Sequence, residues 1–414
     1  MTAIAPCRIC SVEDSFAPLS PILDLGKTPL ANRLVVATSP QPDPTFPLSV
    51  AFCPKCSLVQ ITETVPPETL FSDYLYFSSY STTMLAHAEE GAQRIVHRRS
   101  LGPEHLVVEL ASNDGYMLQF FKRAGVRVLG VEPAKNIARV AQERGIETRA
   151  EFFSLDYART LRDERVAADV VIGNNVLAHV ADVHGFVAGI QVLIEERDGE
   201  AVLEFPYVRE MIDRLEYDTI YHEHLCYFSL HSVQELFRQH GLTITEVQRL
   251  AIHGGSLRIT ARMTKSGRAP APSVTELLEE ERAAGVCEID YYRRFADAVR
   301  QTREAFLSLL GQLRSEGKRI VGYGAAAKAC TLLHFCEVGV DTIECIADRN
   351  PHKQGLRTPG TRIPVVSVEA LVEMKPDVVV VFPWNIKDEI LSQLDGLRRS
   401  GTRMLIPLPE PILV

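Results

Sequence analysis

The sequence predicts an α/β protein with two doubly wound domains behind a small N-terminal domain. Three observations lead to this prediction. Two C-x-x-C pairs lie near the N-terminus. Two later segments each run from an apolar strand through a turn of small residues into a helix, which is how nucleotide-binding, Rossmann-like domains begin. The chain of 414 residues is also too long for one ordinary core, so two or three domains are expected.

The composition excludes several classes of protein. Hydrophobic residues make up 46% of the chain and charged residues 23%, which is typical of a globular protein. The net charge of −9 argues against nucleic acid as the main partner, because a surface that binds a phosphate backbone is usually basic. No apolar run is long enough to span a membrane, and the N-terminus lacks a signal pattern. We therefore expect a cytoplasmic monomer with no nucleic-acid or membrane partner.

The cysteine pairs predict a metal site in residues 1–75. Each C-x-x-C unit is short enough to place both sulfurs on one ion, and four thiolates complete a tetrahedral zinc shell. Such a closed shell leaves no position open for a substrate, so the zinc would be structural. The alternatives are a redox pair or two unrelated reduced pairs. The predicted ligands are Cys7, Cys10, Cys53 and Cys56.

Residues 76–268 read as a cofactor-binding domain. A buried strand over 106–110 runs into the turn Ala111-Ser112-Asn113-Asp114-Gly115, and the next strand ends at Glu132, whose carboxylate can accept both hydroxyls of a ribose. The turn has one glycine, which tells against NAD and is compatible with S-adenosylmethionine (SAM), a cofactor without a pyrophosphate. The predicted cofactor-binding residues are Glu109, Ala111, Asn113, Gly115, Glu132 and Asn174.

The segment Tyr221-His222-Glu223-His224 is predicted to carry the chemistry. It places a phenol, two imidazoles and a carboxylate within four residues, and these groups can move protons. In a helix, Tyr221 and His224 would share a face, and so would His222 with Leu225 or Cys226. Once roles are assigned to Tyr221, Glu223 and His224, His222 is expected to be structural. The alternative is a polar loop with solvated histidines. Further on, Gly254-Gly255 permits either close approach to a ligand beside Ser256 and Arg258 or a hairpin turn.

Residues 269–414 read as a second nucleotide-binding domain, joined to the first by a charged helical connector over 275–313. The turn Gly322-Tyr323-Gly324 leads into a helix at Lys328, where backbone N–H groups and the ammonium can hold a phosphate. The third glycine of the NAD fingerprint is missing. A basic loop follows Asp348 and is either a pyrophosphate clamp or a solvated loop. The predicted substrate-binding residues are Gly324, Lys328, Asp348, Arg349, Lys353, Ser256 and Arg258.

The order of these motifs resembles the SAM-dependent C-methyltransferases of nucleotide-activated deoxysugars, and the resemblance covers nearly the whole chain. It implies an N-terminal zinc-binding domain, a class I (Rossmann-like) methyltransferase domain and a C-terminal Rossmann-like domain that holds the nucleotide. The family's usual substrate is a 4-keto-deoxysugar nucleotide, commonly dTDP-linked, methylated at C3. By position in the motifs, its catalytic residues fall on Tyr76, His179, Tyr221, Glu223 and His224.

One helix departs from the family pattern. After Lys328 the family usually reads G-N-T-L-L-N, whereas this chain has Ala329, Cys330 and His334 at the first, second and last of these positions. The missing amide lies on a helix expected to face the nucleotide. The identity of the base therefore stays open.

The expected mechanism is a carbon-acid reaction. His224 would remove the proton at C3, Glu223 would orient the imidazole or bind a sugar hydroxyl, and an enolate would form. Tyr221, Tyr76 or His179 would stabilise the enolate oxygen by hydrogen bonding. The alternatives are an O- or N-methyltransferase acting on a sugar nucleotide, an NAD-dependent oxidoreductase or epimerase, and a non-catalytic zinc scaffold.

Overall fold

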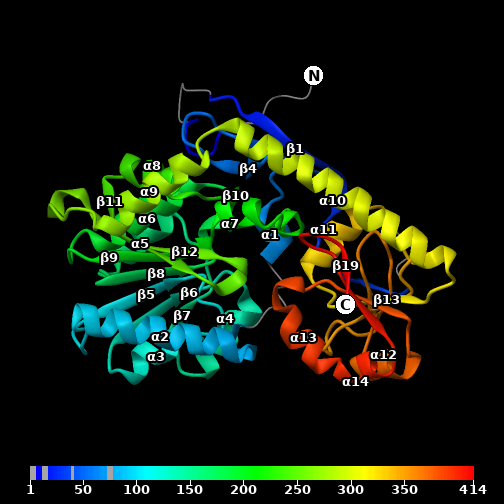
Figure 1. Ribbon diagram of the computed structural model, residues 1–414. Helices are drawn as coiled ribbons and strands as arrows, with labels where there is room; N and C mark the ends of the chain where they lie inside the picture. The colour runs from blue at the N-terminus through cyan, green and yellow to red at the C-terminus, as the bar shows by residue number, and fades with distance from the viewer. Residues whose placement is uncertain (1–5, 12–16, 39–41, 72–77) are drawn as a thin grey trace.

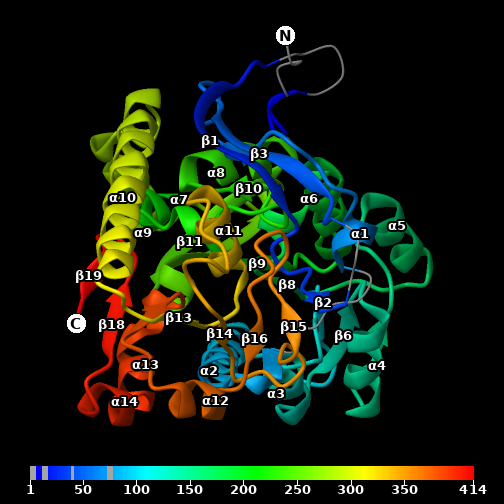
Figure 2. The same cartoon turned by 90° about the vertical axis from the view of Figure 1, so that its right-hand side faces the viewer.

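Three sheets organise the fold of the computed structural model (Figure 1), which describes the chain except for residues 1–5, 12–16, 39–41 and 72–77. Two α/β lobes stand side by side, and a smaller sheet lies over their junction. Seen at 90° (Figure 2), the long helix α10 (Ile289–Ser315) runs along one edge of the molecule. The α/β class predicted from the sequence is confirmed.

The N-terminal sheet includes a strand that directly follows the segment Tyr221-His222-Glu223-His224, which we call the YHEH segment. Its order is β1-β3-β4-β10, and β10 (Cys226–Tyr227) follows directly after His224 and Leu225. Cys226 pairs with Gln60 and Tyr227 with Val59, so segments 166 and 168 residues apart share one ladder. The sheet of the metal-site region therefore includes the strand that follows the predicted catalytic segment. The other strands are β1 (Ser20–Pro29), β3 (Thr45–Phe52) and β4 (Val59–Ile61).

The middle sheet has the order β11-β12-β9-β8-β5-β6-β7. All its pairs are parallel except those of β12, which runs antiparallel to both neighbours. Its central strands are buried on both faces, which explains their continuous apolar sequences. The strands are β5 (Leu106–Leu110), β6 (Arg127–Val131), β7 (Thr148–Arg149), β8 (Val170–Asn174), β9 (Glu200–Pro206), β11 (Leu242–Leu250) and β12 (Ser256–Met263).

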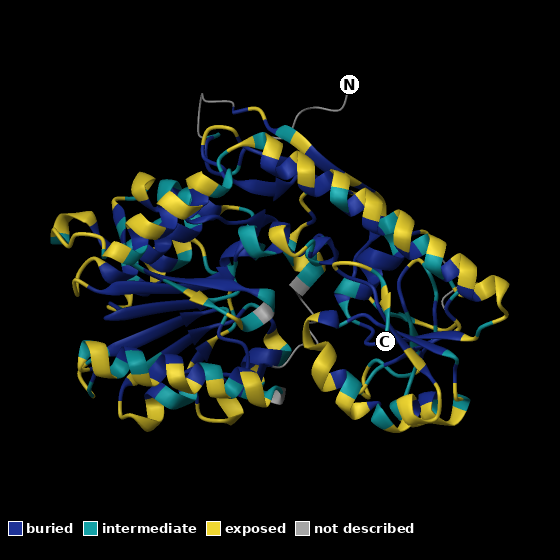
Figure 3. Ribbon diagram, viewed as in Figure 1, coloured by how far each residue is buried: buried dark blue, intermediate teal, exposed yellow. Residues whose placement is uncertain are grey.

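Helices cover both faces of this sheet. On one face, Val107 and Val170 pack with the helices α2 and α3, and on the other Val108 and Val171 pack with α5, α6 and α8. Successive residues of a strand therefore pack into the cores on opposite faces of the sheet, because side chains alternate between the two faces. Figure 3 shows the buried strands between helices whose outer sides are exposed. The helices are α2 (Thr82–Arg99), α3 (Leu118–Arg123), α4 (Lys135–Glu143), α5 (Leu155–Asp163), α6 (Val183–Ile194), α7 (Val208–Asp213) and α8 (Leu230–Gln239).

The C-terminal sheet has the order β16-β14-β13-β17-β18-β19, parallel except for the last pair. The strand before Asp348 is short, β14 (Ile346–Ala347). The other strands are β13 (Ile320–Tyr323), β16 (Val365–Val366), β17 (Val378–Val381), β18 (Arg403–Ile406) and β19 (Ile412–Leu413). The helices are α11 (Ala327–Phe335), α12 (Val368–Met374), α13 (Lys387–Gln393) and α14 (Asp395–Arg399).

The expected connector is two helices. Gly285, at φ +86°, ends α9 (Pro272–Ala284), because a left-handed residue closes a helix and glycine adopts that conformation at little cost. α9 packs on β11 and α8 of the middle region, while α10 reaches both β1 and α7. A further link is the small ladder between β2 (Val35–Val36) and β15 (Leu356–Arg357), which ties the N-terminal region to the C-terminal one.

No helix in the described ranges is both long and apolar enough to cross a membrane.

The buried carboxylate of Glu281 on α9 caps α8. Its oxygens accept the N–H of Leu230 at 2.7 Å and of His231 at 3.0 Å, and the side chain is fully buried. We expect Glu281→Ala to lower the free energy of unfolding by about 3 kcal/mol, because two backbone donors lose their acceptor. Urea titration followed by circular dichroism measures this. The control Glu279→Ala, on the exposed side of α9, should change little, and equal losses in the two variants would contradict the capping role.

Candidate active site

Four thiols gather at the N-terminal sheet. The sulfurs of Cys7, Cys10, Cys53 and Cys56 all lie within 4.8 Å of one another, and all four residues are buried. Cys7 Sγ and Cys56 Sγ are 3.6 Å apart, close to the roughly 3.8 Å between ligands of a tetrahedral zinc–thiolate centre with 2.3 Å bonds. The N–H of Cys10 points at Cys7 Sγ from 3.4 Å, as in a C-x-x-C knuckle. This donor set fits Zn²⁺.

The turn after β5 is shaped by three residues in the left-handed region. Ala111 has φ +52°, Asn113 +49° and Gly115 +77°. A Cβ on Gly115 would lie 3.0 Å from Ile146, so glycine is required there on two grounds. The turn lies at the carboxyl end of a central parallel strand, where doubly wound folds bind their ligands.

Glu132 closes this turn. Its carboxylate accepts the N–H of Asn113 and the N–H of Ala134, both at 2.9 Å. Each oxygen keeps a second lone pair, so the group can still accept from the hydroxyls of a ribose. Burial raises the pKa of Glu132, and these two backbone hydrogen bonds oppose that shift.

Glu109 is a buried acid with only partial compensation. It is fully buried, no side chain among the described residues donates a hydrogen bond to its carboxylate, and the backbone at Leu118 acts only in part against the effect of burial on its pKa. Burial, with Glu132 and Asp114 adding to it, raises its pKa well above the usual value. A cofactor that brings positive charge would relieve this situation. SAM carries an ammonium and a sulfonium, so the residues present fit that cofactor.

The residues just before α2 contact the turn from Ala111 to Gly115. Ser78 in η1 (Ser78–Tyr80) donates its N–H to Asn113 Oδ1 at 2.9 Å, and Ser79 Oγ contacts Asp114. Arg144 pairs with the same oxygen of Asp114 at 2.9 Å and also donates to Ser79 Oγ at 3.1 Å. The predicted site residue Tyr76 lies outside the described residues, two positions before Ser78.

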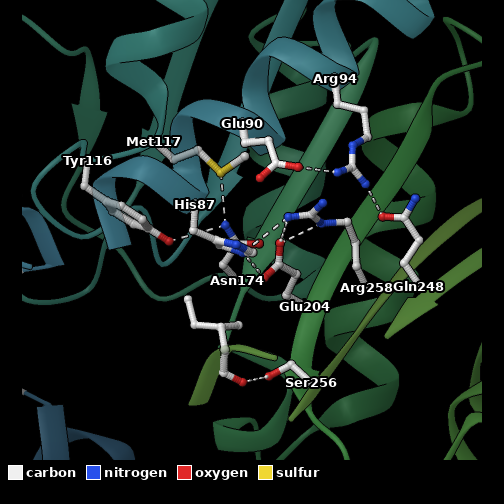
Figure 4. Close-up of polar contacts among 11 residues, drawn as sticks. His87, Glu90, Arg94, Tyr116, Met117, Asn174, Glu204, Gln248, Ser256 and Arg258 are labelled. Carbon is white, nitrogen blue, oxygen red and sulfur yellow. Dashed lines mark hydrogen bonds and ion pairs between the residues drawn. The ribbon is translucent and has the colours of Figure 1, made fainter. Parts of the chain in front are cut away.

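Figure 4 shows the adjoining strand ends beneath α2. Asn174, at the end of β8, donates to Met117 Sδ at 3.0 Å and to Tyr116 Oη at 3.3 Å. Glu204, on β9, lies between Arg258 and His87: its Oε1 accepts from Arg258 Nε at 2.7 Å, and its Oε2 lies 2.8 Å from His87 Nε2. Burial opposes the charge of Glu204, but His87 and Arg258 outweigh it and lower its pKa.

This places two predicted substrate residues in internal contacts. Arg258 is buried under α2, where a Cβ on Gly91 would lie 3.2 Å from its Nη2. Ser256 donates to the carbonyl of Ile252 at 3.2 Å. Their binding of substrate stays a prediction.

The YHEH segment is a turn, not a helix. His224 N–H donates to the Tyr221 carbonyl at 2.9 Å, and the tight turn brings the two side chains together. Tyr221 Oη lies 3.0 Å from His224 Nε2. His224 Nδ1 lies 2.8 Å from the carbonyl of Thr219, which can only accept. Nδ1 therefore carries the proton, and in the neutral ring Nε2 has the basic lone pair beside the phenol.

His179 lies against this pair. Its ring centroid is 4.9 Å from that of His224, and its Nδ1 donates to the carbonyl of Glu223 at 2.6 Å. Burial lowers its pKa to about 4, so the ring is neutral at pH 7. His179 therefore fixes the backbone of Glu223 from one side. The sequence-predicted group of Tyr221, Glu223, His224 and His179 is brought together by the fold.

His222, the remaining residue of the segment from Tyr221 to His224, points away from this group. It is buried, its Nε2 donates to the Pro47 carbonyl at 3.0 Å, and its ring packs edge-on against Phe46. These partners belong to the N-terminal sheet. His222 is structural, as its sequence position suggested.

Glu223 has a partner that sequence reasoning missed. Asn32 Nδ2, in the loop after β1, donates to Oε1 at 2.8 Å and Oε2 at 3.0 Å. Burial raises the pKa of Glu223 to about 7, and the Asn32 amide opposes this. No motif marks Asn32, because its role depends on a contact across 191 residues.

In the C-terminal region, Asp348 closes the glycine turn. It accepts the N–H of Ala325 and the N–H of Asn350, both at 2.8 Å. Gly324 has φ +89°, and a Cβ there would lie 2.4 Å from Pro383. Lys353 donates to the Ala325 carbonyl at 2.8 Å, while Arg349 is exposed. Gly324, Asp348 and Lys353 are thus neighbours at one strand end.

Lys328 occupies a different environment. Its Nζ is buried, has no hydrogen-bond partner among the described residues, and lies 4.8 Å from the centre of the Trp384 ring. Its charge lowers the pKa of both Glu216 and Asp218, in each case against a larger effect of burial.

Three family models match this chain: a zinc binding domain over residues 7–71, a methyltransferase domain over 84–247 and a C-methyltransferase C-terminal domain over 251–409. The chain is also 35% identical to C-methyltransferase NovU of Streptomyces niveus over 412 residues, 99% of this chain and 97% of that protein. The chain belongs to the C-methyltransferase family. It is a SAM-dependent C-methyltransferase, as the sequence predicted.

Two other similarities are partial. A ubiquinone biosynthesis O-methyltransferase of Methylobacterium sp. (strain 4-46) is 32% identical over 116 residues, 26% of this C-methyltransferase and 45% of that protein. The crystal structure of PH0226 protein from Pyrococcus horikoshii OT3 superposes with a TM-score of 0.37 at 16% identity, covering 49% of this chain and 100% of that one.

The contact between Asn32 and Glu223 predicts a pH effect. Removing the amide in Asn32→Ala should raise the pKa of Glu223 above about 7, because the donor favours the ionised carboxylate. In the proposed reaction the ionised form of Glu223 is the active one. The pH below which protonation of Glu223 lowers the rate should therefore increase. We expect the acidic limb of the pH–rate profile of methyl transfer to move to higher pH.

The control for Asn32→Ala is Arg33→Ala, an exposed neighbour in the same loop. Arg33→Ala should keep the wild-type thermal midpoint, whereas Asn32→Ala should lower it modestly, because the buried Glu223 carboxylate loses its donor. An acidic limb that stays in place in Asn32→Ala would contradict the coupling to Glu223.

Proposed function

We propose that this C-methyltransferase methylates C3 of a 4-keto-deoxysugar linked to a nucleoside diphosphate, with a dTDP-linked sugar as the first substrate to test. The observation that carries the proposal is the state of His224. Its Nδ1 proton is held by the Thr219 carbonyl, so Nε2 is the basic nitrogen. A base with a fixed tautomer is what proton removal from carbon requires.

Carbon next to a ketone loses a proton far more readily than an ordinary C–H group, because the charge spreads onto oxygen as an enolate. His224 Nε2 takes that proton. The resulting imidazolium can donate its Nε2–H to the Tyr221 oxygen 3.0 Å away, which frees the phenol O–H for the enolate oxygen. Bound SAM supplies the electrophilic methyl group.

The neighbouring groups have separate tasks in this proposal. Neutral His179 gives its Nδ1–H to the Glu223 carbonyl and holds that backbone in place. Glu223 has a pKa of about 7, and its ionised form accepts a hydrogen bond from a sugar hydroxyl. The Thr219 carbonyl, by contrast, orients the imidazole. Tyr76 is proposed as a second donor to the enolate.

The cofactor and the nucleotide take opposite sides of this group. SAM is proposed to bind at the turn from Ala111 to Gly115, with its positive charge near Glu109 and its ribose at Glu132. Asn174 lies at the adjoining strand end. The nucleoside diphosphate is proposed to bind at the C-terminal turn, with Gly324, Lys353 and Arg349 facing the phosphates and Asp348 the ribose.

The four thiols are proposed to hold one structural Zn²⁺. The sheet that carries them is short and its loops are rich in proline, so a bound ion would supply much of its folding free energy. Because β10 belongs to the same sheet, the ion would also stabilise the chain where it leaves the catalytic turn.

His224→Asn tests the proposed chemistry. We expect exchange of the C3 proton of a dTDP-4-keto-deoxysugar with solvent deuterium, followed by NMR, to fall at least about 100-fold, since the base is lost. Affinity for S-adenosylhomocysteine should be unchanged. His222→Asn is the matched control and should keep wild-type exchange. Wild-type exchange in His224→Asn would exclude this base, and a product with its methyl group on oxygen would exclude C-methylation of this substrate.

Cys56→Ser tests the metal. We expect the zinc content, measured by atomic emission, to fall from one ion per chain to a small fraction, and methyl transfer to fall with it, because the N-terminal sheet loses its cross-link. Cys287→Ser removes a thiol outside the cluster and should keep both. A full zinc content in Cys56→Ser would show that the ion binds elsewhere.

A further inference from the structure

The short helix η3 (Tyr217–Thr219) is the direct support of the base. Its last residue, Thr219, provides the carbonyl that accepts the His224 Nδ1 proton at 2.8 Å. Tyr217 and Asp218 are buried. A shift of this carbonyl would release the proton, and the ring would then divide between its two neutral tautomers.

The C-terminal region holds η3 on both sides of Thr219. Before it, Trp384 Nε1 donates to Asp218 Oδ2 at 2.7 Å. After it, Thr331 Oγ1 on α11 donates to the Ile220 carbonyl at 3.0 Å. Both contacts are buried, and both donors come from the region predicted to bind the nucleotide. In addition, α11 packs against η3, with Tyr217 and Phe335 edge to face at 5.5 Å.

The hydrogen bond from Trp384 is important because its acceptor, Asp218, is a buried carboxylate. Asp218 is 1% exposed, and its other oxygen, Oδ1, has no hydrogen-bond partner among the described residues. Burial raises the pKa of Asp218, while Lys328 and the Trp384 N–H act against that shift. Lys328 in turn lies over the Trp384 ring. Without the indole donor, this buried carboxylate would lose its side-chain hydrogen bond and depend on the backbone of η3 itself, at Asp218 and Thr219, so η3 would have to adjust.

We infer that Trp384 and Thr331 are positioning residues for His224: the C-terminal domain fixes the tautomer of the catalytic base through the backbone of η3. This inference rests on the proposed role of His224 as the base. It gives the C-terminal domain a second task besides binding the nucleotide. A displacement of about 1 Å in a catalytic group is enough to reduce a rate roughly 100-fold, so a contact outside the reacting groups can control the reaction.

The test compares Trp384→Phe with Tyr291→Phe. Both remove an aromatic donor from a carboxylate, since Tyr291 Oη donates to Asp213 at 2.6 Å, but Asp213 lies outside η3. The tautomer of His224 is read from imidazole ¹⁵N shifts in the ligand-free protein, with the signal assigned by its loss in His224→Asn. We expect a single Nδ1–H form in the wild type and Tyr291→Phe, and a mixture in Trp384→Phe.

The kinetic expectation follows from the same cause. In Trp384→Phe, kcat and the rate of C3 proton exchange should fall by about 10- to 100-fold, while KM for SAM stays within about twofold. Thr331→Val, which keeps the side-chain shape, should change the tautomer in the same direction by a smaller amount. It also provides the test if Trp384→Phe does not fold.

The outcomes separate the two claims. A wild-type protein that neither exchanges nor methylates any nucleotide-linked ketosugar would overturn the proposed function, and the ¹⁵N shifts would still decide the tautomer. A pure Nδ1–H form of His224 in Trp384→Phe and Thr331→Val would overturn the inference, whatever happens to activity. A mixed tautomer with the kinetic loss, absent from Tyr291→Phe, would support it.

Discussion

The hydrogen bond from His224 to the Thr219 carbonyl is the contact on which the candidate site depends. A carbonyl oxygen can only accept, so this one bond fixes which nitrogen of the ring is basic. A four-residue turn alone cannot hold such a bond in place. The segment is held instead by its neighbours: β10 extends it into the N-terminal sheet, and η3 joins it to the C-terminal region. The reactive turn is thus shared by all three parts of the fold.

The two nucleotide-type turns are closed by the same device. In the middle sheet, Glu132 accepts one N–H from the turn after the first strand and another two residues further along its own loop. Asp348 does the same in the C-terminal sheet, with Ala325 and Asn350. A single carboxylate therefore links two loops at adjacent strand ends in each domain. It satisfies backbone donors that lie outside the sheet ladders and helices, and each carboxylate oxygen keeps a further lone pair.

Local pattern predicted most of the fold and part of the site. The strand over 106–110 matches the structure to the residue, because a short apolar run that leads directly into a turn of small polar residues favours a buried strand. The YHEH segment was identified by its chemistry, but its turn was not foreseen. Asn32 and Asp218 were missed because their value comes from partners 191 and 166 residues away. Trp384 offered one signal, as the single tryptophan of the chain.

The distribution of buried acids explains why the site needs several domains. Glu109, Glu132, Glu216, Asp218 and Glu223 all have raised pKa values, and in each case burial is the largest cause. Uncompensated, such groups would take up protons and destabilise the fold. Different groups stabilise the ionised forms of these acids. The Asn32 amide donates to Glu223, backbone N–H groups donate to Glu132, and the Trp384 indole and the Lys328 ammonium act on Asp218. A single sheet has too few donors at one edge to do this. Assembly of the three domains around one turn therefore solves an electrostatic problem as well as a geometric one.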